Sequence, residues 1–352
     1  MSQTSRELVN AALRFESPAR LPRDLWTLPI GETAAPEILA QIRQQYPSDF
    51  GGPASVYLPS ACQQGDPYTP GTFTDDWGCV FVNIQPGVIG EVRDPILTDL
   101  AATHQVQPPL ETLPHDMNDA RDAVNRSCTA SDRFMKASCC PRPWERYQFL
   151  RGTMNAMMDI MDPGQGARSV LSRIHEFYLR ELEFWVTTDV DGIMFMDDWG
   201  SQDQLLIPPS IWRDLFKPLY RDYCDLAHAK GKSVFMHSDG HISEIYPDLI
   251  DVGVDALNSQ LFCMDLADIA AKAKGRLTFW GEIDRQHVLT DPDPEVGRNA
   301  VRYVAEHLYD PSGGIIAQFE FGAAAKGETA LAIFEEWDRI DRQTLATSAV
   351  SS

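Results

Sequence analysis

The sequence predicts one α/β domain, a (β/α)8 TIM barrel with an elaborated N-terminal segment. From about residue 117 onward, short apolar runs alternate with amphipathic stretches of helix length, which is typical of a parallel sheet. About five such units in the C-terminal half, with two or three weaker ones before them, approach the eight units of a barrel. A doubly wound sheet shows the same alternation, but the chain has no GxGxxG or Walker loop to support its nucleotide site.

Composition excludes several classes of partner. The net charge of −21 argues against nucleic acid and anionic membrane surfaces. Seven cysteines without CxxC spacing indicate a reducing compartment rather than a disulfide framework. The chain shows neither the apolar core of a signal peptide nor a run of transmembrane length, so we expect a cytoplasmic protein. The oligomeric state, a homodimer included, is left open.

The N-terminal third carries the weakest periodicity. Residues 4–15 have apolar side chains at helical spacing, and 21–26 are predicted as the first strand. Residues 27–115 are rich in Pro, Gly and Thr, yet they contain a predicted hairpin at 78–83 and 87–92. We therefore expect 27–115 to be an elaboration packed on the barrel rather than a linker.

The remaining elements alternate in order, and the whole of 1–345 is predicted as one domain with a disordered tail at 346–352. Met154 and Met158 are expected to face the core. Strands are predicted at 134–137, 192–196, 233–236, near 256, 277–280 and 315–317. Helices are predicted at 117–125, 143–161, 167–187, 209–230, 242–252, 266–274, 294–308 and 328–340.

Polar side chains follow five successive predicted strands. In a barrel the C-terminal strand ends converge on one mouth, where active sites lie. Any one of these residues also has a simpler explanation as the N-cap of the next helix. The residues are Asp197, Asp198, Gln202, His237, Asp239, Asn258, Gln260, Glu282, Asp284, Gln318 and Glu320.

A metal site is predicted at His237. His237 and Asp239 are two residues apart, so in an extended chain both point to the same side. With Glu282 and Glu320 from other strand ends, they offer the N and O ligands of zinc or a similar divalent metal. Two alternatives stay open: a metal-free carboxylate cluster whose mutual repulsion raises a pKa for general-acid work, and a core histidine with Asp239 as a helix cap.

The same strand ends supply the other candidate site residues. The predicted catalytic residues are Asp197, Asp198 and His237. The residues predicted to bind the substrate are Trp199, Gln202, Asn258, Gln260 and Glu282.

At these residues the sequence resembles the uroporphyrinogen decarboxylase (URO-D) superfamily. Residues 10–22 and 143–152 resemble its N-terminal segment and its central helix. Four strand ends resemble its C-terminal motifs: Asp-Asp-Trp-Gly-Ser-Gln at 197–202, His-Ser-Asp-Gly-His-Ile at 237–242, Asp-Ala-Leu-Asn-Ser-Gln at 255–260 and Trp-Gly-Glu-Ile-Asp at 280–284. The resemblance implies the same barrel that the periodicity predicts.

Within the superfamily, the resemblance favours the corrinoid-linked methyltransferase branch over true decarboxylases. The latter carry a Pro-x-Trp-x-Met-Arg-Gln-Ala-Gly-Arg segment that grips a polycarboxylate, whereas here only Arg20 and Arg23 lie near the corresponding place. The methyltransferases bind zinc through His-x-Cys and a later cysteine. This chain has His237-Ser-Asp239 and, later, Phe319, so its ligand set would consist of N and O donors.

The resemblance thus implies a metal-assisted methyltransferase acting on a thiol, hydroxyl or methyl ether. Its partners would be a small-molecule methyl donor or acceptor and a separate protein that carries a corrinoid (cobalamin) cofactor. Two other functions remain open: a metal-independent decarboxylase or lyase acting on a small acid, and a non-catalytic tetrapyrrole-binding protein of the same fold.

Overall fold

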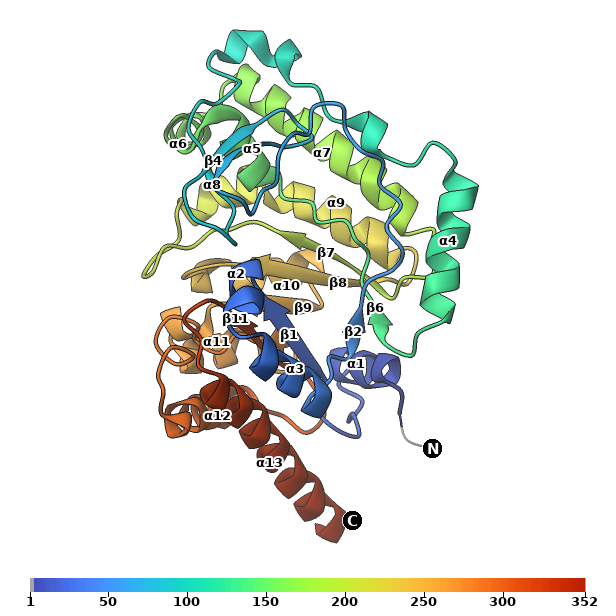
Figure 1. Cartoon of the computed structure of the whole chain (residues 1–352), viewed down its shortest axis with the longest axis vertical. Coiled ribbons are helices and arrows are strands. Elements are labelled where there is room, and N and C mark those ends of the chain that lie inside the picture. Colours follow the sequence, from blue (N-terminus) through green and yellow to red (C-terminus); the bar gives the residue numbers. More distant parts are fainter. Residues whose placement is uncertain (1–2, 352) are drawn as a thin grey trace.

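The structure is a computed structural model that describes residues 3–351, with side chains as far as residue 344. Six parallel strands form one curved sheet in the order β1-β11-β10-β9-β8-β7 (Figure 1). The short pair β2 and β6 completes the ring. Lys136 bridges to Gly192 at the start of β7, and the Asp49 amide donates to the Arg23 carbonyl of β1 at 2.9 Å. The predicted eight-stranded barrel is confirmed. Its strands are β1 (Arg23–Thr27), β2 (Phe50–Gly51), β6 (Phe134–Met135), β7 (Gly192–Met196), β8 (Ser233–Ser238), β9 (Ala256–Ser259), β10 (Thr278–Trp280) and β11 (Ile315–Phe321).

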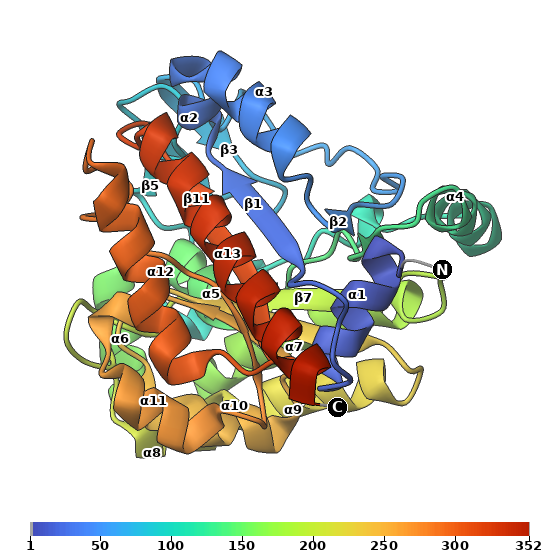
Figure 2. The same ribbon diagram turned by 90° about the horizontal axis from the view of Figure 1, so that it is seen from below.

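Helices surround this ring, and Figure 2 shows α12 and α13 side by side along its outside. The α-helices are α1 (Ser5–Leu13), α2 (Pro29–Ala34), α3 (Pro36–Gln45), α4 (Met117–Thr129), α5 (Pro143–Arg151), α6 (Thr153–Met161), α7 (Gln165–Trp185), α8 (Pro209–Leu215), α9 (Lys217–His228), α10 (Tyr246–Val252), α11 (Leu266–Ala273), α12 (Pro294–Leu308) and α13 (Gly327–Ser351). Short 3-10 helices are η1 (Leu100–Gln105), η2 (Leu110–Thr112), η3 (Ser243–Ile245) and η4 (Leu261–Cys263).

Two predicted helices are each broken in two. The helix expected at 143–161 splits at Gly152, whose φ of 79° lies in the left-handed region that glycine adopts at little cost. After the turn, α6 faces the core with Ala156 and Ile160, so Met154 and Met158, which we expected in the core, are 79% and 61% exposed. The helix expected at 209–230 is interrupted at Phe216, just before Pro218.

The C-terminal helix is longer than the sequence predicts. We expected a disordered tail at 346–352, whereas α13 continues to Ser351. Residue 352 lies outside the described residues.

The barrel interior is filled by aromatic side chains. Phe50, Phe134, Phe235 and Trp280 form one buried cluster, each contributed by a different strand through the two-residue alternation. Helix α1 adds Val9 to this cluster, so α1 closes one end of the barrel. The interior is thus packed, and a site can form only towards the other end.

Within the predicted elaboration at 27–115, β2 is a strand of the barrel itself, and the part of the chain after it packs against the barrel helices. The predicted hairpin is confirmed as β4 (Val80–Asn83) and β5 (Glu91–Val92), and β3 (Gly71–Thr74), which the sequence did not reveal, extends it to three strands. Phe81 packs on Phe149 of α5 with ring centroids 5.1 Å apart. The three-stranded sheet and the barrel helices contribute side chains to one hydrophobic core.

No helix in the described part of the chain is long and apolar enough to cross a membrane. All seven cysteines are free thiols.

Candidate metal centre

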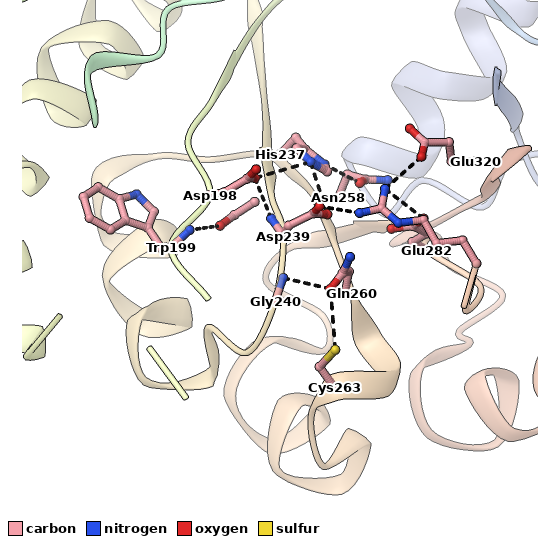
Figure 3. A network of polar contacts seen from close by, with 12 residues as sticks. Asp198, Trp199, His237, Asp239, Gly240, Asn258, Gln260, Cys263, Glu282 and Glu320 are labelled. Carbon is pink, nitrogen blue, oxygen red and sulfur yellow. Dashed lines mark hydrogen bonds and ion pairs between the residues drawn. The ribbon is translucent and has the colours of Figure 1, made fainter. Parts of the chain in front are cut away.

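His237 lies at the end of β8 and points into the mouth of the barrel. Strand register pairs it with Met196 of β7 and Asn258 of β9. Its ring lies against Trp26 of β1, with centroids 5.3 Å apart, and the residue is only 5% exposed. The next residue, Ser238, points outward and accepts a hydrogen bond from the Trp199 amide. Alternation along β8 therefore brings His237 to the centre of the mouth (Figure 3).

Asn258 determines which nitrogen of His237 carries hydrogen. The Asn258 Nδ2 donates to the Trp280 carbonyl at 2.5 Å and to the Gln318 Oε1 at 2.9 Å, so its Oδ1 is left as an acceptor. The His237 Nδ1 lies 2.7 Å from that oxygen and must donate to it. In the neutral ring, Nε2 then carries a lone pair, the arrangement typical of metal-ligating histidines.

Two carboxylates face the Nε2 atom. The Asp198 Oδ1 lies 3.6 Å from it, and the Asp239 Oδ1 lies 3.5 Å from it. The Asp239 amide donates to the Asp198 Oδ1 at 2.9 Å, which links the loops after β7 and β8. Ligand atoms of the three residues lie within 4.8 Å of one another. The Asp239 Oδ1 is also buried without a hydrogen-bond partner, a costly state unless a cation or water satisfies it.

Arg285 organises the predicted ligands Glu282 and Glu320 around itself, away from Nε2. Its Nη1 donates to the Glu320 Oε1 at 2.9 Å and lies 3.7 Å from the Glu282 Oε1, while its Nη2 pairs with the Asp239 Oδ2. The group of atoms around Nε2 consequently comprises Asp198 and Asp239, and of the predicted ligands only His237 and Asp239 belong to it. Burial raises the pKa of Glu282 to about 8, so this carboxyl carries a proton near neutral pH.

Asp197 and Trp199 point away from the mouth. Asp197 is fully buried and accepts from the Trp144 and Glu145 amides at 3.0 and 2.8 Å, which caps the N-terminus of α5. The Tyr220 hydroxyl donates to Asp197 at 2.6 Å and accepts from the Trp199 Nε1 at 2.8 Å. Asp197 and Trp199 therefore hold α5 and Tyr220 in place behind the mouth and do not face it. Figure 3 shows Trp199 directed away from His237.

Three other predicted residues meet around a small cavity. Gln202, Gln260 and Glu282 line a cavity of about 50 Å³ beside Arg285. The Gln260 Oε1 accepts from the Gly240 amide at 3.0 Å, so this side chain is held in place. Asn258 contacts the imidazole and does not line the cavity, which makes it a positioning residue.

Three side chains of the candidate site were not found from the sequence: Arg285, Glu145 and Lys136. Arg285 follows Glu282 by three residues, outside any strand. Glu145, in the first turn of α5, has a buried Oε2 without a hydrogen-bond partner. Burial raises the pKa of Glu145 to about 7, with Arg142 opposing the shift and the neighbouring Asp198 adding to it. The sequence did contain one indication for Glu145: it is an acidic residue in the first turn of the helix that follows a strand end.

Lys136 forms the floor below the imidazole. Its Nζ lies 3.9 Å from the Trp280 ring centroid and 3.6 Å from the Asp24 Oδ2. The indoles of Trp26 and Trp280 donate to the same Asp24 oxygen at 3.2 and 3.1 Å. Burial lowers the pKa of Lys136, and Asp24 opposes that shift. The floor is therefore a buried ion pair enclosed by aromatic rings.

Comparison with known proteins gives a family model and a set of solved structures. The model described as uroporphyrinogen decarboxylase (URO-D) matches residues 75–328. A methyltransferase from Methanosarcina mazei superposes over 96% of this chain and 99% of its own, at 15% identity and a TM-score of 0.66, a likeness of fold. A chitinase from Chromobacterium violaceum covers 90% of this chain and 98% of its own, at 9% identity and a TM-score of 0.42. None of the curated proteins compared matches the sequence.

Proposed function

The chain belongs to the uroporphyrinogen decarboxylase family, and from this premise we propose that it is a metal-assisted methyltransferase. It would move a methyl group between a small substrate, a thiol, hydroxyl or methyl ether, and a separate protein that carries a corrinoid. The observation that carries the proposal is the arrangement of Asp198, His237 and Asp239 around one point. The corrinoid partner follows from the family resemblance.

The donor set fits a divalent metal such as zinc. Bonds of about 2.0–2.1 Å in tetrahedral geometry place two ligand atoms about 3.3 Å apart. The Nε2 atom lies 3.5 and 3.6 Å from the two carboxylate oxygens, beyond the 2.7–3.2 Å of most hydrogen bonds. Three protein ligands with an open fourth position are typical of catalytic zinc. The all-N/O set suits zinc less strongly than thiolates would, and it also suits manganese or iron.

The residues of the chain divide the work of the proposed reaction. A bound metal would supply Lewis acidity to a substrate oxygen or sulfur. Asn258 holds the His237 ring with Nε2 facing the ligand position, and Arg285 holds the Asp239 carboxylate. Glu145, with a pKa near 7, would take the proton that a thiol or hydroxyl loses as it becomes the nucleophile. The aromatic floor around Lys136 excludes water from below.

Metal content of the purified protein tests the proposal. We expect about one equivalent of a divalent metal, retained in His228→Ala and lost in His237→Ala. His228 is a matched control because it also pairs with an aspartate, Asp255 at 2.9 Å, but on the outer surface. Demethylation of methylcobalamin by a thiol, followed by absorbance, should require the same metal. Wild-type protein that neither contains nor binds a metal would refute the metal-assisted reaction.

A metal-independent decarboxylase acting on a small acid is the second candidate. It is favoured by two buried carboxyls, Glu145 and Glu282, whose pKa values are raised to about 7 and 8 and which can therefore donate protons near neutral pH. Chelator-treated protein would keep this activity and lose the methyl transfer.

A further inference from the structure

A second cavity lies between the elaboration and the barrel helices, apart from the residues around His237. Its volume is about 380 Å³, within the range of small-molecule sites. Residues 57–63 before β3 and the turn between β3 and β4 form one wall, and α5 and α7 form the other, on the side where Figure 1 shows β4 near α5. Its rim includes Ser138 and Cys140, which follow β6 at its C-terminal end.

Aromatic rings make up much of the lining. Trp77 packs edge-on against Phe177, with centroids 5.2 Å apart, and Tyr57, Phe73 and Tyr178 add further ring surface. The Arg146 guanidinium already lies over the Trp77 ring at 5.0 Å. The cation-binding ring face is therefore occupied by a residue of the chain, and a cationic ligand would compete with it.

Two polar groups of the cavity lining, on Arg146 and Glu181, can donate hydrogen bonds to a ligand. The Arg146 Nε is buried without a partner, although the guanidinium pairs with Asp75 through Nη1 at 2.5 Å. Glu181 is 8% exposed, and its Oε1 accepts from the Tyr57 hydroxyl at 2.7 Å while its Oε2 has no partner among the described residues. Burial raises the pKa of Glu181 to about 7, so near neutral pH the Oε2 carries a proton in much of the population.

Arg142 is the less compensated of the two arginines in the cavity, since Arg146 pairs closely with Asp75. Its ion pair with Glu145 is long, at 3.7 Å, so the partner compensates its charge only weakly. The Arg142 side chain is about 30% exposed and also faces the Cys140 thiol. A guanidinium in such surroundings favours a planar anion that it can bind through two hydrogen bonds.

We propose that this cavity binds a small carboxylate that carries a planar ring, with Arg142 pairing with its charge. The ring packs on the aromatic wall that Trp77, Phe177 and Tyr178 form along the cavity. The carboxylate accepts hydrogen bonds from Arg142 and from the partnerless donors of Arg146 and Glu181. The inference stands on the cavity alone and does not depend on methyl transfer at His237.

Calorimetric titration of the full-length protein tests the inference with three probes of similar shape. Benzoate should bind at least tenfold more tightly than neutral benzamide, and benzyltrimethylammonium should bind more weakly than both. Benzamide binding as tightly as benzoate, the cation binding best, or no benzoate binding at millimolar concentration would each overturn the proposal.

Variants locate the binding site. Arg142→Gln should weaken benzoate binding at least tenfold at an unchanged melting temperature. Arg168→Gln is the matched control, since Arg168 also pairs with a carboxylate, that of Asp214 at 2.9 Å, but on the exposed face of α7. His237→Ala should bind benzoate like the wild type, so this proposal and the metal-assisted reaction can fail separately. Normal benzoate affinity in Arg142→Gln would refute the assignment.

The pH dependence of binding offers a second readout. Benzoate affinity should fall as the pH rises through 7, because ionised Glu181 repels a carboxylate, and Glu181→Gln should make this decline shallower. Glu145 titrates in the same range beside Arg142, so a residual decline is expected. An equal decline in the variant would contradict the role of Glu181. The groups that face Glu181 electrostatically are Tyr57, Asp76, Arg142, Cys139, Cys140, Tyr178 and Tyr223.

Discussion

Replacing Asn258 with leucine should weaken metal binding at His237 by about 10- to 100-fold, as is typical when the hydrogen-bond partner of a ligating histidine is removed. Asn258 is fully buried and makes three hydrogen bonds: to the His237 Nδ1 at 2.7 Å, to the Trp280 carbonyl and to the Gln318 Oε1. Leucine has a similar size but makes none of them. The imidazole would lose the acceptor that orients it.

The same change leaves three buried polar groups without a partner. Each costs about 1–3 kcal/mol, so the free energy of unfolding should fall by about 3 kcal/mol or more. With an unfolding entropy of about 2.1 cal/mol/K per residue over the 352 residues, that loss lowers the melting temperature by roughly 4 °C for two-state unfolding.

The assay is competition with a chelator of known affinity, alongside ¹⁵N NMR of the imidazole. Wild-type protein should show hydrogen on Nδ1. Asn258→Asp is the matched variant because it keeps an acceptor facing Nδ1, and the Gln318 amide can turn to donate from its partnerless Nε2. The Asn258→Asp variant should keep the metal affinity of the wild type, whereas the leucine variant should show the weaker affinity given above. Unchanged metal affinity in the leucine variant, or hydrogen on Nε2 in the metal-free wild type, would refute the reasoning.

Three further predictions follow from the same contacts. Asp197→Asn should lower the melting temperature, since it weakens the cap of α5, while Asp198→Asn should lower metal affinity with little change in stability; the opposite pattern would reverse their roles. Burial raises the pKa of Glu282 from its ordinary value of 4.5 to about 8, so the folded state binds more protons than the unfolded state between these values, and stability falls as the pH rises from about 5 to 8. Glu282→Gln should flatten this slope in denaturant titrations at a series of pH values. Limited proteolysis should release no stable fragment ending near residue 115, because the elaboration shares its core with α5 and α7.

The barrel could be predicted from the sequence because the strands from β7 onward are short, mostly apolar runs that end in polar residues, and the helices between them have a repeat near 3.6. The elements with little periodicity were harder. β2 and β6 are each two residues long, and β2 was not predicted as a strand. Gly152 looked like an ordinary helix residue because only its φ of 79° marks the break between α5 and α6.

The sequence places the candidate side chains at the strand ends, but it does not say which side of the chain each of them faces. Asp197 and Asp198 are both acidic, and residue type alone does not say which one faces the barrel axis. Register with β8 and the contacts of Tyr220 decide that Asp198 does. At β11 the alternation was informative: Gln318 and Glu320 point inward, whereas Phe319 packs on Phe334 of α13, with centroids 4.8 Å apart. A ligand at position 319 would therefore face the helix layer.

The distribution of charge in the mouth explains why a metal is the complement that fits best. Arg285 neutralises Glu320 and one oxygen of Asp239, so these groups need no further cation. The other Asp239 oxygen is buried without a partner and, with the Asp198 Oδ1, faces the Nε2 atom of His237. A proton on Nε2 would supply one positive charge, but at 3.5 and 3.6 Å it would form no good hydrogen bond to either carboxylate. A dication bound by Nε2 and the two carboxylate oxygens would balance the charges of Asp198 and Asp239. The present distances of 3.5 and 3.6 Å are already close to the spacing between two ligands of one metal ion. The arginine and the proposed metal thus divide one acidic cluster between them, and the metal occupies the side that lies against the imidazole.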